Sequence, residues 1–534
     1  MEIQKLYTRD ILEITFASDF KYSNPYIEGE LSIHFYSPDG ENTIVKGFWD
    51  GANVWKVRFA PSLQGIWKWE SKSENKTDKG LNGKAGIFEV ITYEGNNPIL
   101  KHGFLKVSDN GRGFEHEDGK KFFWLGDTVW GVTAKGKIED WKDFIDYRNA
   151  QGFNVVCINA LSQYDGSVGV SCLEPYESEG NMMKWDRPNI SYFQCLDKIM
   201  DITKQAGMYT ALVALWFDFV PGANAGWETV RKEGLTPDLA ALYGSYMAAR
   251  YSAFGAIWFI SGDSDFNNEE AISIYSSTAR SIQQNTPYEP LITAHLQMGL
   301  VTPEALNDME WFNFHMYQSS HRMESVQTSI DCAKGCRALK PVRPVLNGEP
   351  CYENICCYKE LDKKLNREFT REVLWKSILA GGNAGITYGA HGIWSWHCEG
   401  EPFHYEKDWG MPVSWREAMK FEGSHDAVRM KGFFEELPWW ELEPANGKLN
   451  VNYSEGVIAA TPDDSLIVAY ISKGRKQLKF EMPEKSKYMA SIFDPVNGDM
   501  KAEEYVIEDG EIHFDFSSFE NDIVISLKAD NNSK

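Results

Sequence analysis

Alternating apolar and polar positions mark both ends of the chain. In the first 95 residues this pattern, broken by turn-forming residues, predicts five strands: 11–16, 27–36, 54–59, 65–69 and 86–91. Near the C-terminus the same pattern predicts five more strands: 457–460, 466–471, 488–493, 511–516 and 523–527. Turns recur about every ten residues, a spacing typical of β-sandwiches. The sequence therefore predicts one β-sandwich domain over residues 1–95 and another over residues 438–534.

Between these domains, apolar strands alternate with helices. Eight predicted strands lead into polar residues: 121–125, 153–158, 208–215, 256–260, 291–295, 311–317, 344–346 and 385–388. The alternation over residues 100–437 predicts a (β/α)8 TIM barrel, flanked by the two β-sandwich domains. A doubly wound sheet would alternate in the same way. It usually has a Gly-rich phosphate loop after an early strand, and the sequence has none there.

Two carboxylates follow strands of the predicted barrel. Asp263 comes after the fourth strand and Glu349 after the seventh, each directly behind a glycine, and Gly348 lets the backbone turn sharply. A carboxylate after a strand is often only a helix N-cap, and that interpretation is favoured for Asp265. A pair of acids at a barrel mouth permits glycoside hydrolysis: one protonates the leaving oxygen, and the other attacks the anomeric carbon or activates water. We therefore predict that Asp263 and Glu349 are catalytic.

Further polar and aromatic residues near strand ends are candidates for substrate binding. These residues are Asp127, Trp130, Asn159, Gln163, Trp216, His315, Tyr317, His391, Trp394 and Trp396. Tyr317 ends the strand beside Glu349, so we expect its hydroxyl to donate a hydrogen bond to Glu349 and keep it ionised. Trp394 and Trp396 are expected to form the floor beneath a sugar ring.

Composition narrows the possible partners. The chain has 54 basic and 77 acidic residues, a net charge of −23, which disfavours nucleic acids and anionic membranes as partners. No apolar run approaches the ~20 residues of a membrane span. The start of the chain lacks a signal-peptide pattern, so a cytoplasmic location is expected, with secretion possible if a signal was removed. We expect a carbohydrate substrate; the oligomeric state is unknown.

Two other functions are compatible with the pattern. His295, His315 and His391 suggest a metal-dependent barrel hydrolase, but the first strand lacks the HxH pair common in such sites. The nine cysteines, an odd number without metal-type spacing, indicate reduced thiols, so no metal or other cofactor is expected. The second alternative is a non-catalytic carbohydrate-binding protein, which the paired acids disfavour.

Several segments together resemble a known family. FFWLGDTVW, IWFISGDSDF, VLNGEPCYE, ILAGGNAGITYGAHGIWSW and MASIFDPVNGD are similar to segments of bacterial apiosidase-like barrel glycosidases, some of which act on pectic side chains. The first domain is similar to the sandwich that often precedes these barrels, and the last resembles a module labelled collagen-binding. The resemblance implies Asp263 as acid/base, Glu349 as nucleophile, retention of configuration and a plant-type saccharide substrate. Ser261 departs from the pattern, which has a second glycine there.

Overall fold

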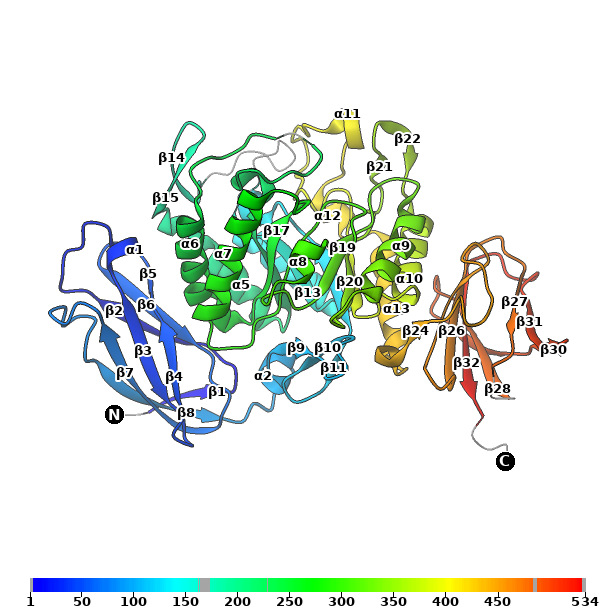
Figure 1. Cartoon of the computed structure of the whole chain (residues 1–534), viewed down its shortest axis with the longest axis horizontal. Coiled ribbons are helices and arrows are strands. Elements are labelled where there is room, and N and C mark those ends of the chain that lie inside the picture. The colour runs from blue at the N-terminus through cyan, green and yellow to red at the C-terminus, as the bar shows by residue number, and fades with distance from the viewer. Residues whose placement is uncertain (1–2, 162, 164–172, 228, 484–486, 531–534) are drawn as a thin grey trace.

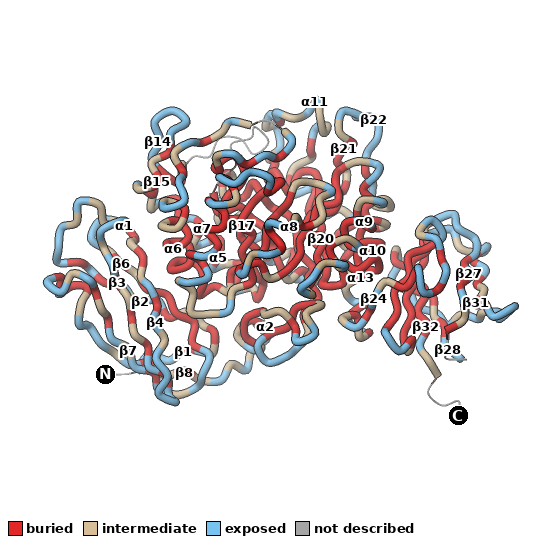
Figure 2. The backbone as a smooth tube through the Cα atoms, in the orientation of Figure 1, coloured by how far each residue is buried: buried red, intermediate tan, exposed pale blue. Residues whose placement is uncertain are grey.

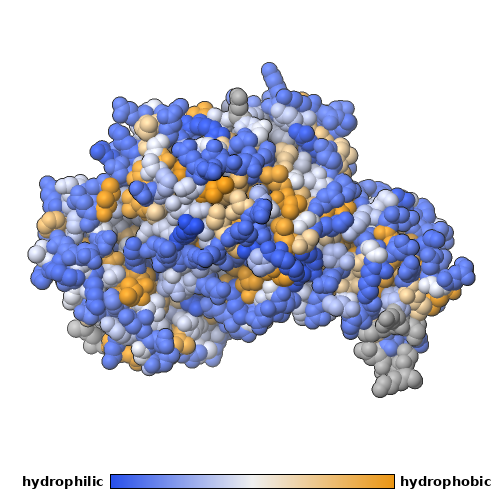
Figure 3. All heavy atoms as spheres, viewed as in Figure 1, coloured by the Kyte–Doolittle hydropathy of each residue, from blue (hydrophilic) through white to orange (hydrophobic). Residues whose placement is uncertain are grey.

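The computed structural model describes residues 3–161, 163, 173–227, 229–483 and 487–530. Figure 1 shows three parts along the long axis: a β domain at the N-terminal end, a barrel surrounded by helices in the middle, and a second β domain at the C-terminal end. The barrel interior is the most continuously buried region, as Figure 2 shows. The face seen in Figure 3 is mostly hydrophilic, with smaller hydrophobic patches between the hydrophilic regions.

The N-terminal domain consists of two sheets packed face to face. One has the order β1-β8-β7-β3-β4 and the other β2-β6-β5. The strands are β1 (Gln4–Tyr7), β2 (Leu12–Ala17), β3 (Leu31–Tyr36), β4 (Asn42–Lys46), β5 (Phe48–Trp49), β6 (Val54–Phe59), β7 (Gly65–Ser73) and β8 (Ala85–Ile91). All five predicted strands are present, but the one predicted at 27–36 begins only at Leu31. A short helix, α1 (Pro25–Glu28), precedes it, because Asn24 caps the Tyr26 amide and Pro25 suits the first helical position.

A small sheet closes the N-terminal end of the barrel. The helix α2 (Pro98–His102) leads into β9 (Leu105–Val107), β10 (Phe114–His116) and β11 (Lys121–Phe122). Phe114 packs against Trp124 and Phe314, with ring centroids 5.9 and 5.1 Å apart. Aromatic side chains therefore fill the N-terminal end of the barrel, and its C-terminal end stays open for a site.

The predicted TIM barrel is confirmed. Eight parallel strands form one sheet in the order β18-β17-β16-β13-β12-β23-β20-β19. The Asn313 amide donates to the Ile292 carbonyl at 2.9 Å and so joins the two edges. The strands are β12 (Trp124–Thr128), β13 (Val155–Asn159), β16 (Tyr209–Trp216), β17 (Ile257–Gly262), β18 (Ile292–Thr293), β19 (His315–Gln318), β20 (Val345–Glu349) and β23 (Gly385–Tyr388).

Helices surround this barrel. They are α3 (Val132–Lys135), α4 (Ile138–Gln151), α5 (Ile190–Gln205), α6 (Pro237–Tyr251), α7 (Glu269–Asn285), α8 (Glu304–Asn307), α9 (Ser325–Ala338), α10 (Arg367–Leu379) and α13 (Glu422–Glu435). Two hairpins and two short helices lie near the C-terminal ends of the strands: β14 (Tyr176–Glu179) with β15 (Met182–Pro188), β21 (Cys356–Cys357) with β22 (Glu360–Lys364), α11 (Glu406–Trp409) and α12 (Trp415–Ala418). Among the described residues, no helix has the length and apolarity that a membrane span requires.

The sixth barrel strand is shorter than predicted. Only His315–Gln318 forms the strand, whereas the prediction began at Trp311. Trp311 and Phe312 are 1% and 2% exposed, and the Phe312 amide donates to the Met309 carbonyl in a turn. An apolar run indicates burial, but by itself it does not distinguish a buried strand from a buried turn.

The C-terminal domain is a second pair of sheets, with the orders β24-β25-β26-β32-β28-β29 and β27-β31-β30. The strands are β24 (Glu443–Pro444), β25 (Val457–Ala460), β26 (Leu466–Ile471), β27 (Gln477–Glu481), β28 (Tyr488–Phe493), β29 (Met500–Glu503), β30 (Val506–Glu508), β31 (Glu511–Asp515) and β32 (Ile523–Ala529). All five predicted strands are present. Among the strands without a prediction, β29 and β30 are short and largely exposed, so their sequence lacks a clear apolar alternation. β27 was missed although Leu478 and Phe480 alternate with exposed polar residues.

Buried charges attach the N-terminal domain to the barrel. Arg58 of β6 donates from Nη2 to Asp197 Oδ2 of α5 at 2.7 Å, and Arg250 Nη2 of α6 donates to the same oxygen at 2.7 Å.

Replacing Asp197 with alanine leaves two buried guanidinium groups without this partner, so we expect the free energy of unfolding to fall by about 3–5 kcal/mol. Urea denaturation measures it. Asp146→Ala, which removes an exposed pair with Lys142, is the control and should cost less than about 0.5 kcal/mol; equal losses would contradict the prediction.

Candidate active site

Asp263 and Glu349 meet in one pocket at the C-terminal end of the barrel. Asp263 directly follows β17, and Glu349 is the last residue of β20. Both line a cavity of about 430 Å³. Glu349 is 6% exposed. The site thus combines a buried and a partly buried carboxylate from separate strands in one cavity.

The glycines before the two acids serve close packing rather than turning. A Cβ on Gly262 would lie 1.9 Å from the Trp216 ring, and one on Gly348 would lie 2.3 Å from Met316. Both glycines belong to strands and neither has a positive φ, so the prediction that Gly348 turns the backbone sharply is wrong. The residue with an unusual backbone is Asp263 itself, whose φ is +50°. A left-handed conformation at a non-glycine residue is costly, and it recurs where a functional side chain has to be aimed.

Two histidines hold Glu349. His295 Nε2 lies 2.7 Å from Glu349 Oε2, and His321 Nε2 lies 3.1 Å from Glu349 Oε1. The Asp263 amide donates to His295 Nδ1 at 3.3 Å, and the Tyr352 amide donates to His321 Nδ1 at 3.3 Å. Since a backbone N–H only donates, each Nδ1 is an acceptor and each Nε2 carries the proton. Glu349 therefore accepts two N–H···O hydrogen bonds.

Asp263 has its own partners on the other side of His295. Gln318 Nε2 donates to its Oδ1 at 2.5 Å, and Trp227 Nε1 donates to its Oδ2 at 3.3 Å. His295 Nδ1 lies 3.6 Å from Asp263 Oδ1, so one imidazole ring lies between the two acids. The charge of each carboxyl group therefore affects the other through His295, and the Asp263 side chain is more exposed than that of Glu349.

These environments move the two pKa values apart. Burial raises the pKa of Asp263 to about 6; the charge of His295 opposes this effect and the negative charge of Glu349 adds to it. Burial would also raise the pKa of Glu349, but hydrogen bonds from His295 and His321 outweigh it and hold that pKa below its usual range. Below about pH 6 the site therefore presents Asp263 as a protonated acid and Glu349 as a carboxylate, the pair of protonation states that glycoside hydrolysis needs.

Four of the predicted substrate-binding residues line this cavity: Trp130, Gln163, Trp216 and Trp394. Gln163 Oε1 and Trp216 Nε1 are buried and have no hydrogen-bond partner among the residues that the structure describes. A buried acceptor and a buried donor without partners, in the cavity that holds the two acids, can form hydrogen bonds with the hydroxyl groups of a sugar.

Tyr317 and Trp396 do not have the roles predicted for them. The Tyr317 hydroxyl donates to the Ser329 carbonyl at 3.2 Å, so the expected hydrogen bond to Glu349 is wrong. Its side chain points between the strands and α9 instead of into the barrel mouth. Trp396 is fully buried and stacks on Trp415 at 4.4 Å, which makes the expected sugar floor wrong for this residue. Trp394 is the one that lines the cavity.

The other four predicted residues do not line the cavity. Asp127 Oδ2 accepts from Arg148 Nε at 2.6 Å, and His315 Nδ1 lies 2.8 Å from Thr302 Oγ1. Asn159 Nδ2 donates to the Trp130 carbonyl at 3.4 Å. His391 Nε2 donates to the Gly410 carbonyl at 2.9 Å, and its Nδ1 accepts from Trp394 Nε1 at 3.1 Å. Asn159 and His391 therefore contact pocket tryptophans, whereas Asp127 and His315 are structural.

Sequence reasoning missed five residues that contact the acids or their partners. These residues are His321, Gln318, Trp227, Tyr352 and, as a partner of Glu349, His295. Gln318 follows Tyr317 at a strand end, so its position was a usable signal. His295 was considered only as a metal ligand. Among the described residues, no group of three or more His, Cys, Asp and Glu side chains is arranged to hold a metal ion.

Comparisons with known proteins match the barrel and part of the N-terminal domain. The model of the apiosidase-like catalytic domain matches residues 108–441, more than half of the chain, and a domain of unknown function (DUF5060) matches residues 8–74. No curated protein matches the chain.

Solved structures resemble the whole molecule. A candidate glycoside hydrolase from Bacteroides vulgatus ATCC 8482 has a TM-score of 0.74 at 20% identity and covers 98% of this chain and 99% of its own. A glycoside hydrolase family 5 protein from the same organism has a TM-score of 0.66 at 20% identity, covering 81% of this chain and 95% of its own. At these identities the likeness shows the shared fold, and the matching family model shows the relationship. The chain belongs to the apiosidase-like family and is a glycoside hydrolase.

Proposed function

We propose that this enzyme hydrolyses O-glycosidic bonds in plant-type oligosaccharides, polysaccharides or glycosides with retention of configuration. Glu349 is the nucleophile and Asp263 the acid/base in this proposal. The observation that carries it is the pair of histidine N–H groups on Glu349, with Asp263 held separately by Gln318 and Trp227. The apiosidase-like family match supports a plant-type saccharide as substrate.

The reaction proceeds in two steps. In the first, protonated Asp263 gives its proton to the glycosidic oxygen while Glu349 attacks the anomeric carbon, so the bond to the leaving group breaks and a glycosyl ester of Glu349 forms. In the second, Asp263, now a carboxylate, removes a proton from water, and the resulting oxygen nucleophile displaces Glu349 from the anomeric carbon. Two inversions give net retention, and both acids return to their starting states.

The two histidines suit Glu349 to this role. The hydrogen bonds from His295 and His321 stabilise the carboxylate before attack. When Glu349 forms the ester its charge is lost, so the hydrogen bonds weaken, and they strengthen again as it leaves. The aromatic walls, including Trp130, Trp216 and Trp394, exclude water from the ester and offer faces for the sugar.

The stereochemical outcome tests the proposal. A screen of aryl glycosides and pectic oligosaccharides identifies a substrate, and proton NMR during the first minutes of hydrolysis identifies the first anomer released. We expect the anomer of the substrate, because retaining enzymes form a glycosyl-enzyme. An inverted first product would show that one acid activates water directly, and it would remove the nucleophile role from Glu349 while leaving the two-carboxylate site in place.

A further inference from the structure

A buried polar network joins the C-terminal β domain to the barrel. Asp522, 1% exposed, lies just before β32 and accepts from Arg371 of α10, at 2.8 Å from Nε and 2.5 Å from Nη2. The Tyr470 hydroxyl donates to the same carboxylate at 2.8 Å, and its ring stacks on Trp375 of α10. A bidentate ion pair fixes the relative orientation of the two groups as well as their distance. The C-terminal domain therefore packs on α10 in a defined orientation.

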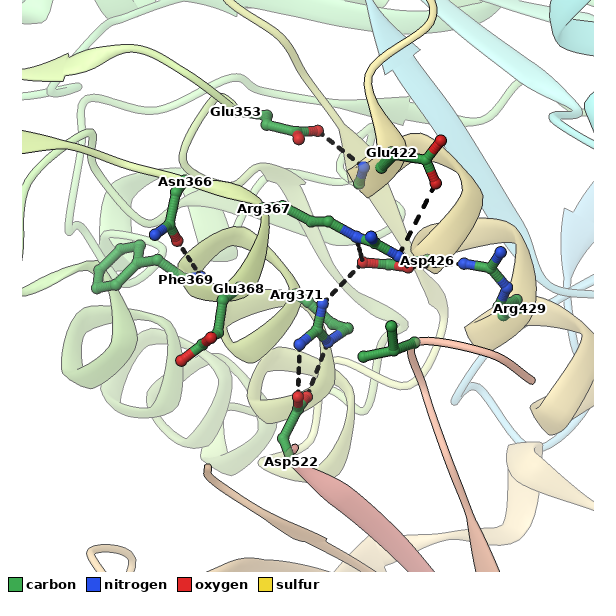
Figure 4. Close-up of polar contacts among 12 residues, drawn as sticks. Glu353, Asn366, Arg367, Glu368, Phe369, Arg371, Glu422, Asp426, Arg429 and Asp522 are labelled. Carbon is green, nitrogen blue, oxygen red and sulfur yellow. Dashed lines mark hydrogen bonds and ion pairs between the residues drawn. The ribbon is translucent and has the colours of Figure 1, made fainter. Parts of the chain in front are cut away.

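The network continues from α10 into α13, as Figure 4 shows. Arg371 Nη1 donates to Asp426 Oδ2 at 2.9 Å. Asp426, 1% exposed, also accepts from Arg367 at 2.6 Å and from Arg429 at 2.8 Å. Arg367 and Arg371 of α10 thus hold the beginning of α13 against α10, and through Arg371 against the C-terminal domain, while Arg429 neutralises Asp426 from within α13.

The N-terminus of α13 binds Glu353, four residues after the proposed nucleophile. The Gly423 amide donates to Glu353 Oε2 at 3.0 Å, and the Tyr388 hydroxyl donates to the same oxygen at 2.5 Å. A Cβ on Gly423 would lie 2.3 Å from that oxygen, so a side chain there would displace the Glu353 carboxylate. A carboxylate is favoured at this position because the amide groups of a helix N-terminus point toward it.

The backbone of Glu353 connects two loops of the pocket wall. Its amide donates to the Gly389 carbonyl at 2.9 Å, and its carbonyl accepts from the His391 amide at 2.9 Å. The loop after β20 carries Tyr352 and the loop after β23 carries Trp394, whose rings stack with centroids 5.9 Å apart. Both rings line the cavity, so the position of Glu353 determines how these two walls meet.

We infer that Glu353 is a positioning residue: anchored to α13 and, through Arg371, to the C-terminal domain, it holds the Tyr352 amide so that His321 keeps the tautomer that donates to Glu349. The contact that transmits the effect is the Tyr352 amide, 3.3 Å from His321 Nδ1. If this amide moves away, Nδ1 is free to take the proton and Nε2 becomes an acceptor facing a carboxylate. The C-terminal domain thereby acts on a site that none of its described residues lines.

The first test needs no substrate. Full-length Glu353→Gln and Asp522→Asn, both close in shape to the native side chains, are compared with the native enzyme by hydrogen exchange of peptides covering residues 349–355. We expect these amides to exchange about tenfold faster in both variants, the factor that corresponds to about one lost hydrogen bond. In nitrogen-15 histidine NMR, with the His321 signal identified by its loss in His321→Asn, the Nε2–H tautomer should lose population.

Glu368→Gln is the matched control. Glu368 lies on α10 and also contacts the C-terminal domain, through Lys473 at 2.7 Å, but both side chains are about half exposed. This variant should leave exchange at 349–355 and the His321 tautomer unchanged. Should Asp522→Asn fail to fold, Tyr388→Phe replaces it, since it removes a donor to Glu353 from within the barrel.

The second test measures steady-state kinetics and rests on the proposed function. With the substrate that the glycoside screen identifies, Glu353→Gln should lower kcat about tenfold with little change in KM. It should also move the acid limb of kcat/KM to higher pH, because Glu349 loses a hydrogen bond that keeps it ionised. A merely structural role would lower the amount of active enzyme without moving this limb.

The outcomes separate the two hypotheses. Native-like exchange and an unchanged His321 tautomer in both Glu353→Gln and the second variant would overturn the positioning inference, whatever the activity. If exchange and tautomer respond but no glycoside is hydrolysed by the native enzyme, the positioning role holds and the proposed function fails.

Discussion

Replacing Glu349 with alanine is expected to lower kcat on the order of 10⁶-fold, because the variant has no group to form the glycosyl ester. The pocket should remain folded, since His295 and His321 keep their backbone donors from Asp263 and Tyr352. Steady-state kinetics measure the loss, and mass spectrometry should detect no glycosyl-enzyme with a slow substrate.

A small anion should restore part of this activity. Azide can occupy the space left by the carboxylate and attack the anomeric carbon once, so the rescued product is the glycosyl azide of inverted configuration. Glu360→Ala, on the exposed β22 strand, is the control and should retain native kinetics. Activity of Glu349→Ala within tenfold of native would exclude Glu349 as nucleophile.

Replacing Asp263 with alanine should have an effect that depends on the leaving group. For substrates with poor leaving groups we expect kcat/KM to fall about 10²–10⁴-fold, the usual contribution of general acid catalysis. Activated aryl glycosides need little protonation, so their glycosylation step should be nearly unaffected. The matched control is Asp265→Asn: Asp265 accepts from the Asn267 amide and from Asn224, and it should not show this dependence. Equal losses for both substrate types would remove the acid role.

The pH profile gives an independent measure of the same group. Because burial raises the pKa of Asp263 to about 6, the protonated acid is lost as the pH rises through this value. We therefore expect kcat/KM of the native enzyme to fall above about pH 6 for substrates with poor leaving groups. In Asp263→Ala this limb should be absent. A native profile that stays flat to pH 9 would contradict the assignment.

The pair of acids was predictable from sequence because each acid is a local feature of one strand. Asp263 and Glu349 follow apolar runs, and parallel barrel strands bring all their C-terminal ends to one face. The glycine before each acid was visible too, but its reason was not. Only the neighbouring strands show that Trp216 and Met316 occupy the space a side chain would need.

The partners of the acids were not predictable in this way. His295 and His321 lie 54 and 28 residues before Glu349 in the chain and reach it only because the barrel closes. Tyr317 and Gln318 are adjacent, and successive strand residues face opposite sides. A local pattern could not show which of the two faces the site, and the prediction chose the wrong one.

The sequence by itself determined the order of the three domains, the barrel and the strand ends that carry Asp263 and Glu349. Hydrophobic periodicity and chain breaks encode these features within a few residues. Only the tertiary structure decided that Trp394 lines the cavity while Trp396 stacks on Trp415. It also decided that Glu349 is held by two imidazoles and that Glu353 connects its loop to α13. These are contacts between residues distant in sequence, which depend on how closed strands and docked domains pack rather than on any local preference.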